Sequence, residues 1–301
     1  MQIKGKTANN VFLQVLSILT DKSDGRVLHS SPRNLPIHEI LNANLVIEDP
    51  TQFLTNRTYL SYAFAELIWY ISGELNPERI IPYAKFWDSI RNYNETVNSN
   101  YGHYIFSSDY PSQYDECKKL LLEDNDTRKA VIQIFDPSTK LTQDTICTET
   151  IQFLLRDDEL HCIVNMRSQD IITGFPYDVF FFCILQQMMR IELSISLDRE
   201  IKLGYYHHNV GSLHLYEKNL NEIDEIQTKK LTKSIPEFTY QSLIEMLEMV
   251  DIEEEIRNKK FISSEVTSPF WLKAIEVLKK KFTPVPKHWT DEFEWINIEG
   301  W

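Results

Sequence analysis

The longest apolar segment, residues 177–192, restricts the possible folds more than any other part of the sequence. Strands usually run to roughly five or six residues, so a segment of this length predicts a buried helix, although it carries Gln186 and Gln187. Shorter apolar segments on both sides predict strands, and further helices lie between them. This mixture predicts an α/β or α+β fold, in which helices flank a substantial sheet.

Apolar spacing and turn-forming residues locate the other elements. One helix follows a capping threonine, Thr7, and another ends at Gly73. The expected helices are residues 7–20, 59–72, 113–122 and 212–226, and the expected strands are 37–47, 130–135, 152–156, 160–167 and 201–208. Residues 21–36 are rich in turn formers and predict a loop. Beyond about residue 231 we expect amphipathic helices, with the acids at 251 and 253–255 on a solvated face.

The charge balance limits the partners that the chain could bind. There are 31 Lys and Arg residues against 44 Asp and Glu residues, a formal net charge of −13. Nonspecific nucleic-acid binding needs a basic surface, so we do not expect nucleic acid as a partner. A small anionic substrate is compatible with this charge, because a few local arginines can hold a phosphate inside an acidic protein.

The sequence also contains evidence on cellular location and on metal binding. No apolar run approaches the roughly 18 residues of a membrane span, and the amino terminus lacks the apolar core of a secretory signal. The four cysteines stand far apart without CxxC spacing, which argues against a zinc site or a disulfide framework. His207 and His208 adjoin each other on a predicted strand and point to opposite faces, so they cannot easily share a metal. We expect a reduced, cytoplasmic protein with no metal and no membrane partner.

Two polar side chains stand in unusual surroundings. Glu66, in the apolar helix FAELIWY, must be hydrogen-bonded, paired or protonated, and a purely structural role is the alternative. Cys147, in DTICTETIQF, precedes a strand and could be a nucleophile if a nearby cation lowered its pKa. An inert thiol is the alternative for any lone cysteine.

Arginine and hydroxyl side chains at strand ends suit phosphate binding. Arg167 and Ser168 end one predicted strand, and Arg128 and Lys129 precede another. Taken separately, such residues are more often surface ion pairs.

Five motifs occur in a fixed order: ELIWYISG (66–73), NSNYG (98–102), CTETIQFLLRD (147–157), VNMRSQDIITGF (164–175) and NVGSLHLY (209–216). In their order and spacing, the sequence resembles the thymidylate synthase superfamily from about residue 7 to residue 225. The resemblance implies a thymidylate synthase-like fold, a large mixed sheet flanked by helices, in a symmetric homodimer packed sheet to sheet. It also implies a catalytic domain, residues 1–230, and a divergent helical extension, residues 231–301, packed on the same domain.

The resemblance assigns roles in catalysis. Cys147 would be the thiolate that adds to C6 of a pyrimidine nucleotide, after which C5 attacks the one-carbon unit of the co-substrate 5,10-methylenetetrahydrofolate. Glu66 would organise water and relay protons, and Tyr101 would help to remove the C5 proton. Three residues would contact the folate: Asp170 by a hydrogen bond to the pterin, Trp87 along the folate side of the pocket, and Gly174.

The resemblance also implies a nucleotide site. The 5′-phosphate would be held by Arg33, Arg167, Ser168, the partner subunit's Arg128 and the partner subunit's Lys129. Arg167 would in addition lower the pKa of the Cys147 thiol by its positive charge. The family usually has a second arginine where Lys129 stands, so the bidentate geometry is partly lost there. His214 and Tyr216 would bind the sugar 3′-hydroxyl.

Asp178 indicates the branch of the family. Thymidylate synthases carry an asparagine at this position, whose amide accepts from N3–H of uracil and donates to O4. A carboxylate cannot donate to O4, whereas a protonated Asp178 could donate to N3 of cytosine and accept from its N4 amino group. The sequence is therefore similar to the deoxycytidylate hydroxymethylase branch, and Thr148, in place of the usual histidine after the nucleophile, agrees with this.

A hydroxymethylase would admit water to the exocyclic methylene at C5, giving a 5-hydroxymethyl nucleotide and tetrahydrofolate. Three alternatives stay open at this point: a thymidylate synthase with altered base recognition, a nucleotide-binding protein without catalysis, and CMP in place of dCMP. The carboxyl end, with Trp301, departs from the synthase pattern and leaves the closing of the site open.

Overall fold

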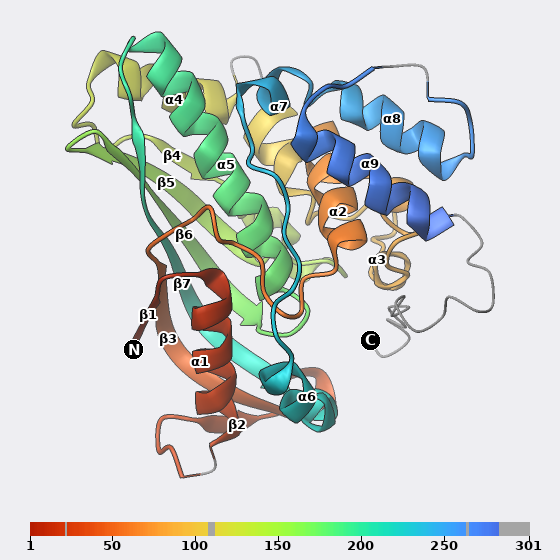
Figure 1. The fold of residues 1–301 in the computed structure, drawn as a ribbon. Coiled ribbons are helices and arrows are strands. Elements are labelled where there is room, and N and C mark those ends of the chain that lie inside the picture. Colours follow the sequence, from red (N-terminus) through yellow and green to blue (C-terminus); the bar gives the residue numbers. More distant parts are fainter. Residues whose placement is uncertain (22, 108–111, 263–264, 283–301) are drawn as a thin grey trace. The chain divides into compact units, whose positions relative to one another are not determined.

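The computed structural model describes residues 1–21, 23–107, 112–262 and 265–282. The chain forms two compact units, each built from several segments (Figure 1). Unit 1 comprises residues 1–58, 108–136 and 146–234, and unit 2 comprises residues 59–107, 137–145 and 235–301. The division of the chain at residue 230 stays a prediction.

The described part of unit 1 is organised around a seven-stranded mixed sheet. Its strands are β1 (Gln2–Gly5), β2 (Leu28–Ser30), β3 (Ile37–Ile47), β4 (Val131–Gln133), β5 (Thr148–Arg156), β6 (Glu159–Asp170) and β7 (Lys202–Tyr216). Their order is β1-β3-β7-β6-β5-β4, with β2 paired to β3. The pairs β1/β3 and β6/β7 are parallel and the others are antiparallel. The predicted large mixed sheet is confirmed.

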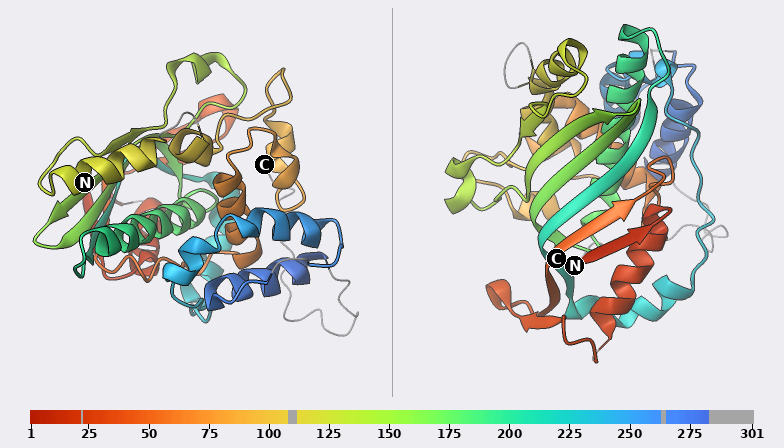
Figure 2. Two further views of the ribbon diagram at one scale, coloured as in Figure 1. Left: turned by 90° about the horizontal axis from the view of Figure 1, so that it is seen from above. Right: turned by 90° about the vertical axis from the view of Figure 1, so that its left-hand side faces the viewer.

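Helices flank this sheet. They are α1 (Ala8–Thr20), α4 (Gln113–Glu123), α5 (Phe175–Ser196) and α6 (Ile223–Thr228), with 3₁₀ turns η1 (Pro32–Asn34) and η5 (Glu217–Glu222). Thr7 caps α1 as predicted, because its hydroxyl accepts the N–H of Asn10 at 3.1 Å. In the right-hand view of Figure 2, strands β5 to β7 lie toward the viewer and α5 lies behind them. One face of the sheet in a single chain is thus not covered by α5.

The predicted buried helix at residues 177–192 is α5, which extends further in both directions. By length and composition alone α5 could cross a membrane, although the sequence has no unbroken apolar run long enough to predict a span. Most of α5 is buried inside the protein, however, and the core helix of a soluble protein passes the same test. This helix alone is therefore weak support for a membrane span.

Two sequence-based expectations in unit 1 were wrong. The helix expected at residues 212–226 begins only at Ile223, because β7 continues through Tyr216 and pairs with β3 from Ile37↔Tyr216 onward. Ladder hydrogen bonds to β3 on one side and β6 on the other outweigh the local helical spacing. The loop expected at residues 21–36 also contains strand β2, which is short and exposed and gives no apolar pattern.

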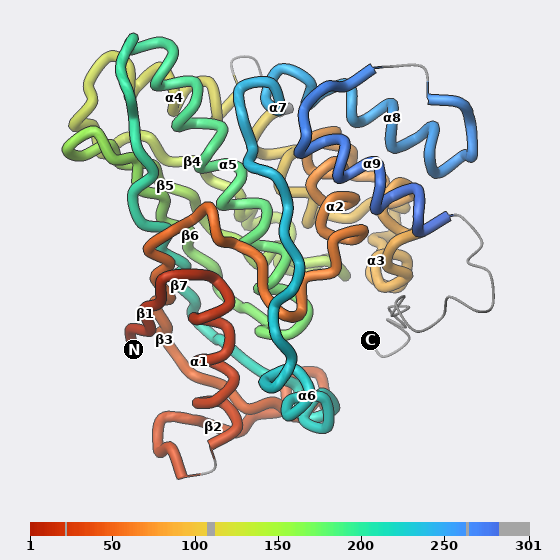
Figure 3. Tube along the Cα trace, viewed as in Figure 1, coloured from red at the N-terminus to blue at the C-terminus, as the bar shows by residue number. Residues whose placement is uncertain are grey.

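The described part of unit 2 is mainly helical. It contains α2 (Leu60–Ser72), η2 (Pro77–Arg79), α3 (Phe86–Ser89), η3 (His103–Ser107), η4 (Pro137–Leu141), α7 (Tyr240–Ile244), α8 (Glu248–Arg257) and α9 (Pro269–Phe282). Helix α2 packs against α8 and α9, and the trace in Figure 3 shows α7, α8 and α9 following one another. Gly73 ends α2 in the left-handed conformation, with φ of 65°. Helices after residue 231 are confirmed within the described residues.

The acidic cluster of α8 is not wholly solvated, contrary to expectation. Glu253 is fully buried and accepts hydrogen bonds from Arg79 Nη1 at 2.6 Å, Tyr83 Oη at 3.0 Å and Arg257 Nε at 3.0 Å. Burial raises the pKa of the Tyr83 hydroxyl well above its usual value, so this hydroxyl is a donor. A buried carboxylate with three donors is a structural anchor of unit 2.

Candidate active site

Cys147 lies immediately before β5, beside the end of β6. The main-chain N–H of Arg167 donates to the Cys147 carbonyl at 2.9 Å, and the side-chain Nε of Arg167 donates to the Ile146 carbonyl at 2.8 Å. These bonds place Nη2 of Arg167 3.5 Å from the Cys147 sulfur. A guanidinium at this distance stabilises a thiolate over a thiol. The β5/β6 pairing is irregular between Thr148 and Thr150, so the strand bulges right after the cysteine.

The other three cysteines are unsuited to nucleophilic chemistry. Cys117, Cys162 and Cys183 are all buried, whereas Cys147 is partly exposed. Burial raises the pKa of the Cys117 thiol to about 12, and burial also raises the pKa of the Cys162 and Cys183 thiols above their usual value. The sequence favoured Cys147 as the nucleophile. Its partial exposure and the neighbouring Arg167 guanidinium agree with that prediction.

Asp178, in the first turn of α5, ends a chain of buried hydrogen bonds. Gln169 Nε2 donates to Asp178 Oδ2 at 2.9 Å, and Gln169 Oε1 lies 2.9 Å from His208 Nε2. His208 Nδ1 in turn lies 2.7 Å from the Tyr206 hydroxyl. Burial raises the pKa of Asp178 to about 7, and the hydrogen bond from Gln169 lowers it in part.

The direction of this chain follows from the protonation of its members. Burial lowers the pKa of His208 to about 3, so its ring is neutral and carries one N–H. Because Gln169 presents its carbonyl oxygen to His208, that proton lies on Nε2 and Nδ1 accepts from Tyr206. Burial raises the pKa of Tyr206, which keeps its hydroxyl protonated. Each hydrogen bond in the chain is therefore donated in the direction of Asp178. The last of them, from Gln169, makes Asp178 Oδ2 an acceptor.

The absence of a side chain at Gly174 leaves room for the Gln169 side chain in this network. A Cβ at Gly174 would lie 2.2 Å from Gln169 Nε2 and 3.0 Å from the Asp170 carbonyl oxygen. The Asp170 carboxylate accepts the N–H of Ile172 at 2.8 Å and the hydroxyl of Thr173. The turn between β6 and α5 is thereby fixed, and with it the direction from which Asp178 enters the site.

Arg33, His214 and Tyr216 form a second group in unit 1. Arg33 is exposed in η1, with φ of 55°, and its Nη2 lies 3.5 Å from the Tyr216 hydroxyl. The His214 ring meets the Tyr216 ring edge-on, with centroids 5.2 Å apart. Lys218, which sequence analysis did not identify, has its Nζ 5.4 Å from the centre of the Tyr216 ring. Two cations therefore flank Tyr216.

The register of the sheet connects these groups. Ser168 lies opposite Ser212, and Asp170 lies opposite His214, across the parallel pair β6/β7. The end of β6, the end of β7 and the start of β5 therefore meet at one edge. This edge carries seven predicted site residues: Cys147, Arg167, Ser168, Asp170, Gly174, Asp178 and His214.

Arg128 and Lys129 do not join this edge. Both are exposed, and they precede edge strand β4, whose Val131 lies opposite Gln152 of β5. Because β4 and β5 are antiparallel, the chain before Val131 runs away from Cys147. At about 3.3 Å per residue, Arg128 lies about 20 Å or more along the strand from Cys147.

The remaining candidates, Glu66, Trp87 and Tyr101, lie in unit 2. Glu66 is buried in α2 and accepts from the Tyr62 hydroxyl at 2.6 Å, and that hydroxyl accepts from Trp87 Nε1 at 3.0 Å. Glu66 is thus hydrogen-bonded, as its apolar surroundings require. Sequence analysis did not identify Tyr62, although it lies one helical turn before Glu66.

Tyr101 is held against the same helix. Its ring stacks on Tyr70 of α2 with centroids 5.1 Å apart. A Cβ at the following residue, Gly102, would lie 1.5 Å from the Tyr70 carbonyl oxygen, so only glycine allows this approach. Within unit 2, Glu66, Trp87 and Tyr101 are therefore arranged around α2.

The raised pKa of Asp178 predicts a pH dependence of stability. Its pKa rises from 3.8 to about 7 in the folded protein, so between these values the folded state keeps a proton that the unfolded chain has lost. The stability contributed by the protonated Asp178 carboxyl is complete below pH 3.8. It is lost as the pH rises through about 7. We expect the free energy of unfolding, measured with urea, to fall over this window by up to about 1.4 kcal/mol per pH unit more in the wild type than in Asp178→Asn. The exposed Asp126→Asn variant should follow the wild type, and equal slopes in all three proteins would contradict the assignment.

Comparisons with known proteins agree with these features. The thymidylate synthase family model matches residues 45–262 of the chain. The deoxycytidylate 5-hydroxymethyltransferase of Enterobacteria phage T4 is 32% identical over 194 residues, covering 62% of this chain and 78% of the phage protein, and that of phage T6 matches to the same extent. The thymidylate synthase of Mycoplasma genitalium is 22% identical over 209 residues, covering 59% of this chain and 70% of that protein. Residues 45–262, which the family model matches, include every predicted site residue except Arg33.

Proposed function

Because the chain belongs to the thymidylate synthase family, we propose that it is a folate-dependent 5-hydroxymethyltransferase of deoxycytidylate or cytidylate. The buried carboxyl of Asp178 carries the proposal, because it stands where the resemblance places the asparagine of uracil-specific enzymes. The similarity to the phage deoxycytidylate 5-hydroxymethyltransferases supports it.

Asp178 would distinguish the bases through its proton. With a pKa of about 7, a substantial fraction of the carboxyl is protonated near neutral pH. Since Gln169 donates to Oδ2, the proton would lie on Oδ1, from which it can be donated to N3 of cytosine, while Oδ2 accepts from the N4 amino group. Uracil offers N3–H and O4 instead, and each unmatched buried group costs about 1–3 kcal/mol.

Cys147 would supply the nucleophile. Its thiolate, stabilised by Arg167, would bond to C6 and make C5 nucleophilic toward the methylene carbon of 5,10-methylenetetrahydrofolate. Removal of the C5 proton, assisted by Tyr101 and by water that Glu66 orients, would release tetrahydrofolate and leave an exocyclic methylene on the base. Addition of water to this methylene and departure of the Cys147 sulfur would restore the aromatic base as 5-hydroxymethylcytosine. The folate would not be oxidised.

The phosphate would be held by Arg33, Arg167 and Ser168 together with a second copy of the chain. In this arrangement the partner subunit's Arg128 and the partner subunit's Lys129 would complete the site. Two observations support this homodimer: one face of the sheet is not covered by α5 (Figure 2), and Arg128 lies far along β5 from Cys147 of its own chain. His214 and Tyr216 would bind the sugar.

Asp170, Gly174 and Trp87 remain our proposed contacts for the folate. Asp170 is suited to a fixed hydrogen bond because two neighbouring donors already hold its carboxylate. A cytoplasmic location stays a prediction. Trp301, whose part in closing the site the sequence left open, lies outside the described residues.

The reaction is tested by supplying CMP, dCMP and dUMP, each tritiated at C5, in parallel. We expect tritium release and a hydroxymethylated product with dCMP or CMP, little release with dUMP, and no dihydrofolate, since the one-carbon unit is transferred without reduction. Formation of dihydrofolate with dUMP would replace the proposal with thymidylate synthesis. Nucleotide binding without tritium release from any substrate would indicate a protein without catalysis.

A further inference from the structure

A second cluster of ligating side chains lies in unit 1, at the strand ends beside η1. His29 of β2 and His38 of β3 are directly opposite each other in the antiparallel ladder. His38 is also opposite Leu215 of β7, two residues before Glu217. Because residues directly opposite each other in a ladder share a face, His29 and His38 emerge on the same face of the sheet. Glu217 is the first residue of η5, directly after β7.

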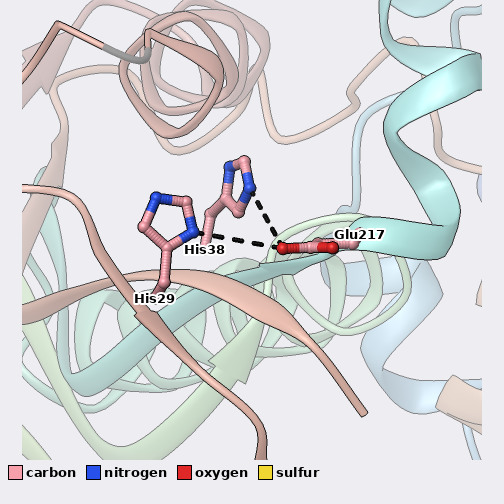
Figure 4. Close-up of side chains that lie close together, drawn as sticks. All are labelled: His29, His38 and Glu217. Atoms are coloured by element: carbon pink, nitrogen blue, oxygen red, sulfur yellow. Dashed lines mark ion pairs between the residues drawn. The ribbon is translucent and has the colours of Figure 1, made fainter.

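The three side chains converge, as Figure 4 shows. Glu217 Oε1 lies 3.6 Å from His38 Nε2 and 4.0 Å from His29 Nδ1. One ligating atom from each residue lies within 4.8 Å of the other two. Ligand atoms in tetrahedral zinc sites lie about 3.4 Å apart, given metal–ligand bonds of about 2.0–2.2 Å. His29 and Glu217 are exposed, with side-chain exposures of 64% and 43%, so both can move the remaining distance.

The orientation of His38 suits a metal ligand. Its Nδ1 lies 2.8 Å from the carbonyl oxygen of Leu19, at the end of α1, which can only accept a hydrogen bond. In its neutral form the ring therefore carries its proton on Nδ1, and Nε2, which lies 3.6 Å from Glu217 Oε1, keeps the lone pair that a metal would bind. Metal-bound histidines are held in this way by a carbonyl acceptor behind the ring.

We propose that His29, His38 and Glu217 bind a divalent metal ion of the zinc class. Two imidazoles and one carboxylate suit Zn²⁺ and similar borderline ions, whereas Mg²⁺ and Ca²⁺ prefer oxygen ligands. Three protein ligands leave a fourth position for water. The site lies outside the chemistry proposed for Cys147, and it departs from the expectation of no metal, which considered only ligands close in sequence.

A metal at this site would connect β2 and β3 to the end of β7. The β2–β3 connection carries Arg33, and Glu217 directly follows Tyr216, which Arg33 contacts. A metal bound by His29, His38 and Glu217 would fix both ends of that connection relative to β7. The same three residues without a metal would form only a histidine–carboxylate ion pair.

The test is titration of the chelator-treated full chain with Zn²⁺, followed by calorimetry, with Mg²⁺ as the control ion. We expect one Zn²⁺ per chain and no Mg²⁺ binding, and at least about tenfold weaker Zn²⁺ binding in His29→Ala and in Glu217→Gln. Both residues are exposed, so these variants should fold, which circular dichroism checks. His207→Ala, which removes another partly exposed imidazole of unit 1, should bind like the wild type.

Cobalt substitution separates this site from Cys147. At the proposed site Co²⁺ should give visible absorption bands without a thiolate-to-metal charge-transfer band, and His29→Ala should abolish them. Zn²⁺ affinity that is unchanged in both variants, or a charge-transfer band that disappears in Cys147→Ser, would overturn the proposal. Either result leaves the hydroxymethyltransferase proposal untouched.

Discussion

Replacing Cys147 with alanine should lower turnover of every pyrimidine nucleotide by at least about 10⁴-fold, as removal of an enzyme nucleophile generally does. No other cysteine can substitute for it, because the other three are buried and burial raises the pKa of each thiol. Tritium release from C5 measures the step directly, since that proton becomes labile only after C6 is attacked. Cys117→Ala, which removes a buried thiol, should keep most of the activity.

A covalent complex provides a second readout for the same substitution. A 5-fluorinated deoxycytidylate should accumulate on the wild-type protein in the presence of the folate, because fluorine cannot leave C5 as a cation. Mass spectrometry should place the adduct on the peptide containing Cys147. An adduct of undiminished yield in Cys147→Ala would exclude this residue as the nucleophile.

The sequence predicted those features that depend on local pattern. The long apolar run identified α5, and the strand expected at residues 37–47 has the bounds of β3. The expected β5/β6 hairpin is also present, but both strands are longer than predicted: β5 begins four residues earlier and β6 ends three residues later. Ordered motifs, not composition, identified the family that the comparison confirms. Cys147 and Arg167 could be paired from sequence only through that resemblance, since twenty positions separate them and only the register of β5 and β6 brings them to 3.5 Å.

Features that depend on pairing between distant strands were missed. The end of β7 was predicted as helix because its local spacing permits one, whereas β3 and β6 hold it extended. His208 was considered only as a metal ligand, although the fold buries it between Tyr206 and Gln169. His29 lies in β2, His38 in β3 and Glu217 at the start of η5, so no spacing rule in the sequence groups them.

Asp178→Asn should reverse the choice of base. Once Gln169 turns over to accept from its nitrogen, the asparagine amide can donate to O4 and accept from N3–H of uracil, and the N4 amino group of cytosine would then face an unmatched buried donor. We expect the ratio of kcat/KM for dCMP to that for dUMP to fall by at least about 10³-fold, within the range seen when a buried polar match is lost. Parallel tritium-release assays on CMP, dCMP and dUMP measure it. An unchanged ratio would remove Asp178 from base recognition.

The pH profile tests whether the proton of Asp178 is what selects cytosine. For the wild type, kcat/KM with dCMP should fall as the pH rises through about 7, the pKa of Asp178, and Asp178→Asn should lack this limb. Gln169→Met removes the hydrogen bond that lowers this pKa, so the falling limb should move to higher pH. Gln187→Met is the matched control, because Gln187 is also buried but donates to the Cys183 carbonyl. A limb that stays in place in Gln169→Met would mean that another group titrates, and Gln169 would then position Asp178 without tuning it.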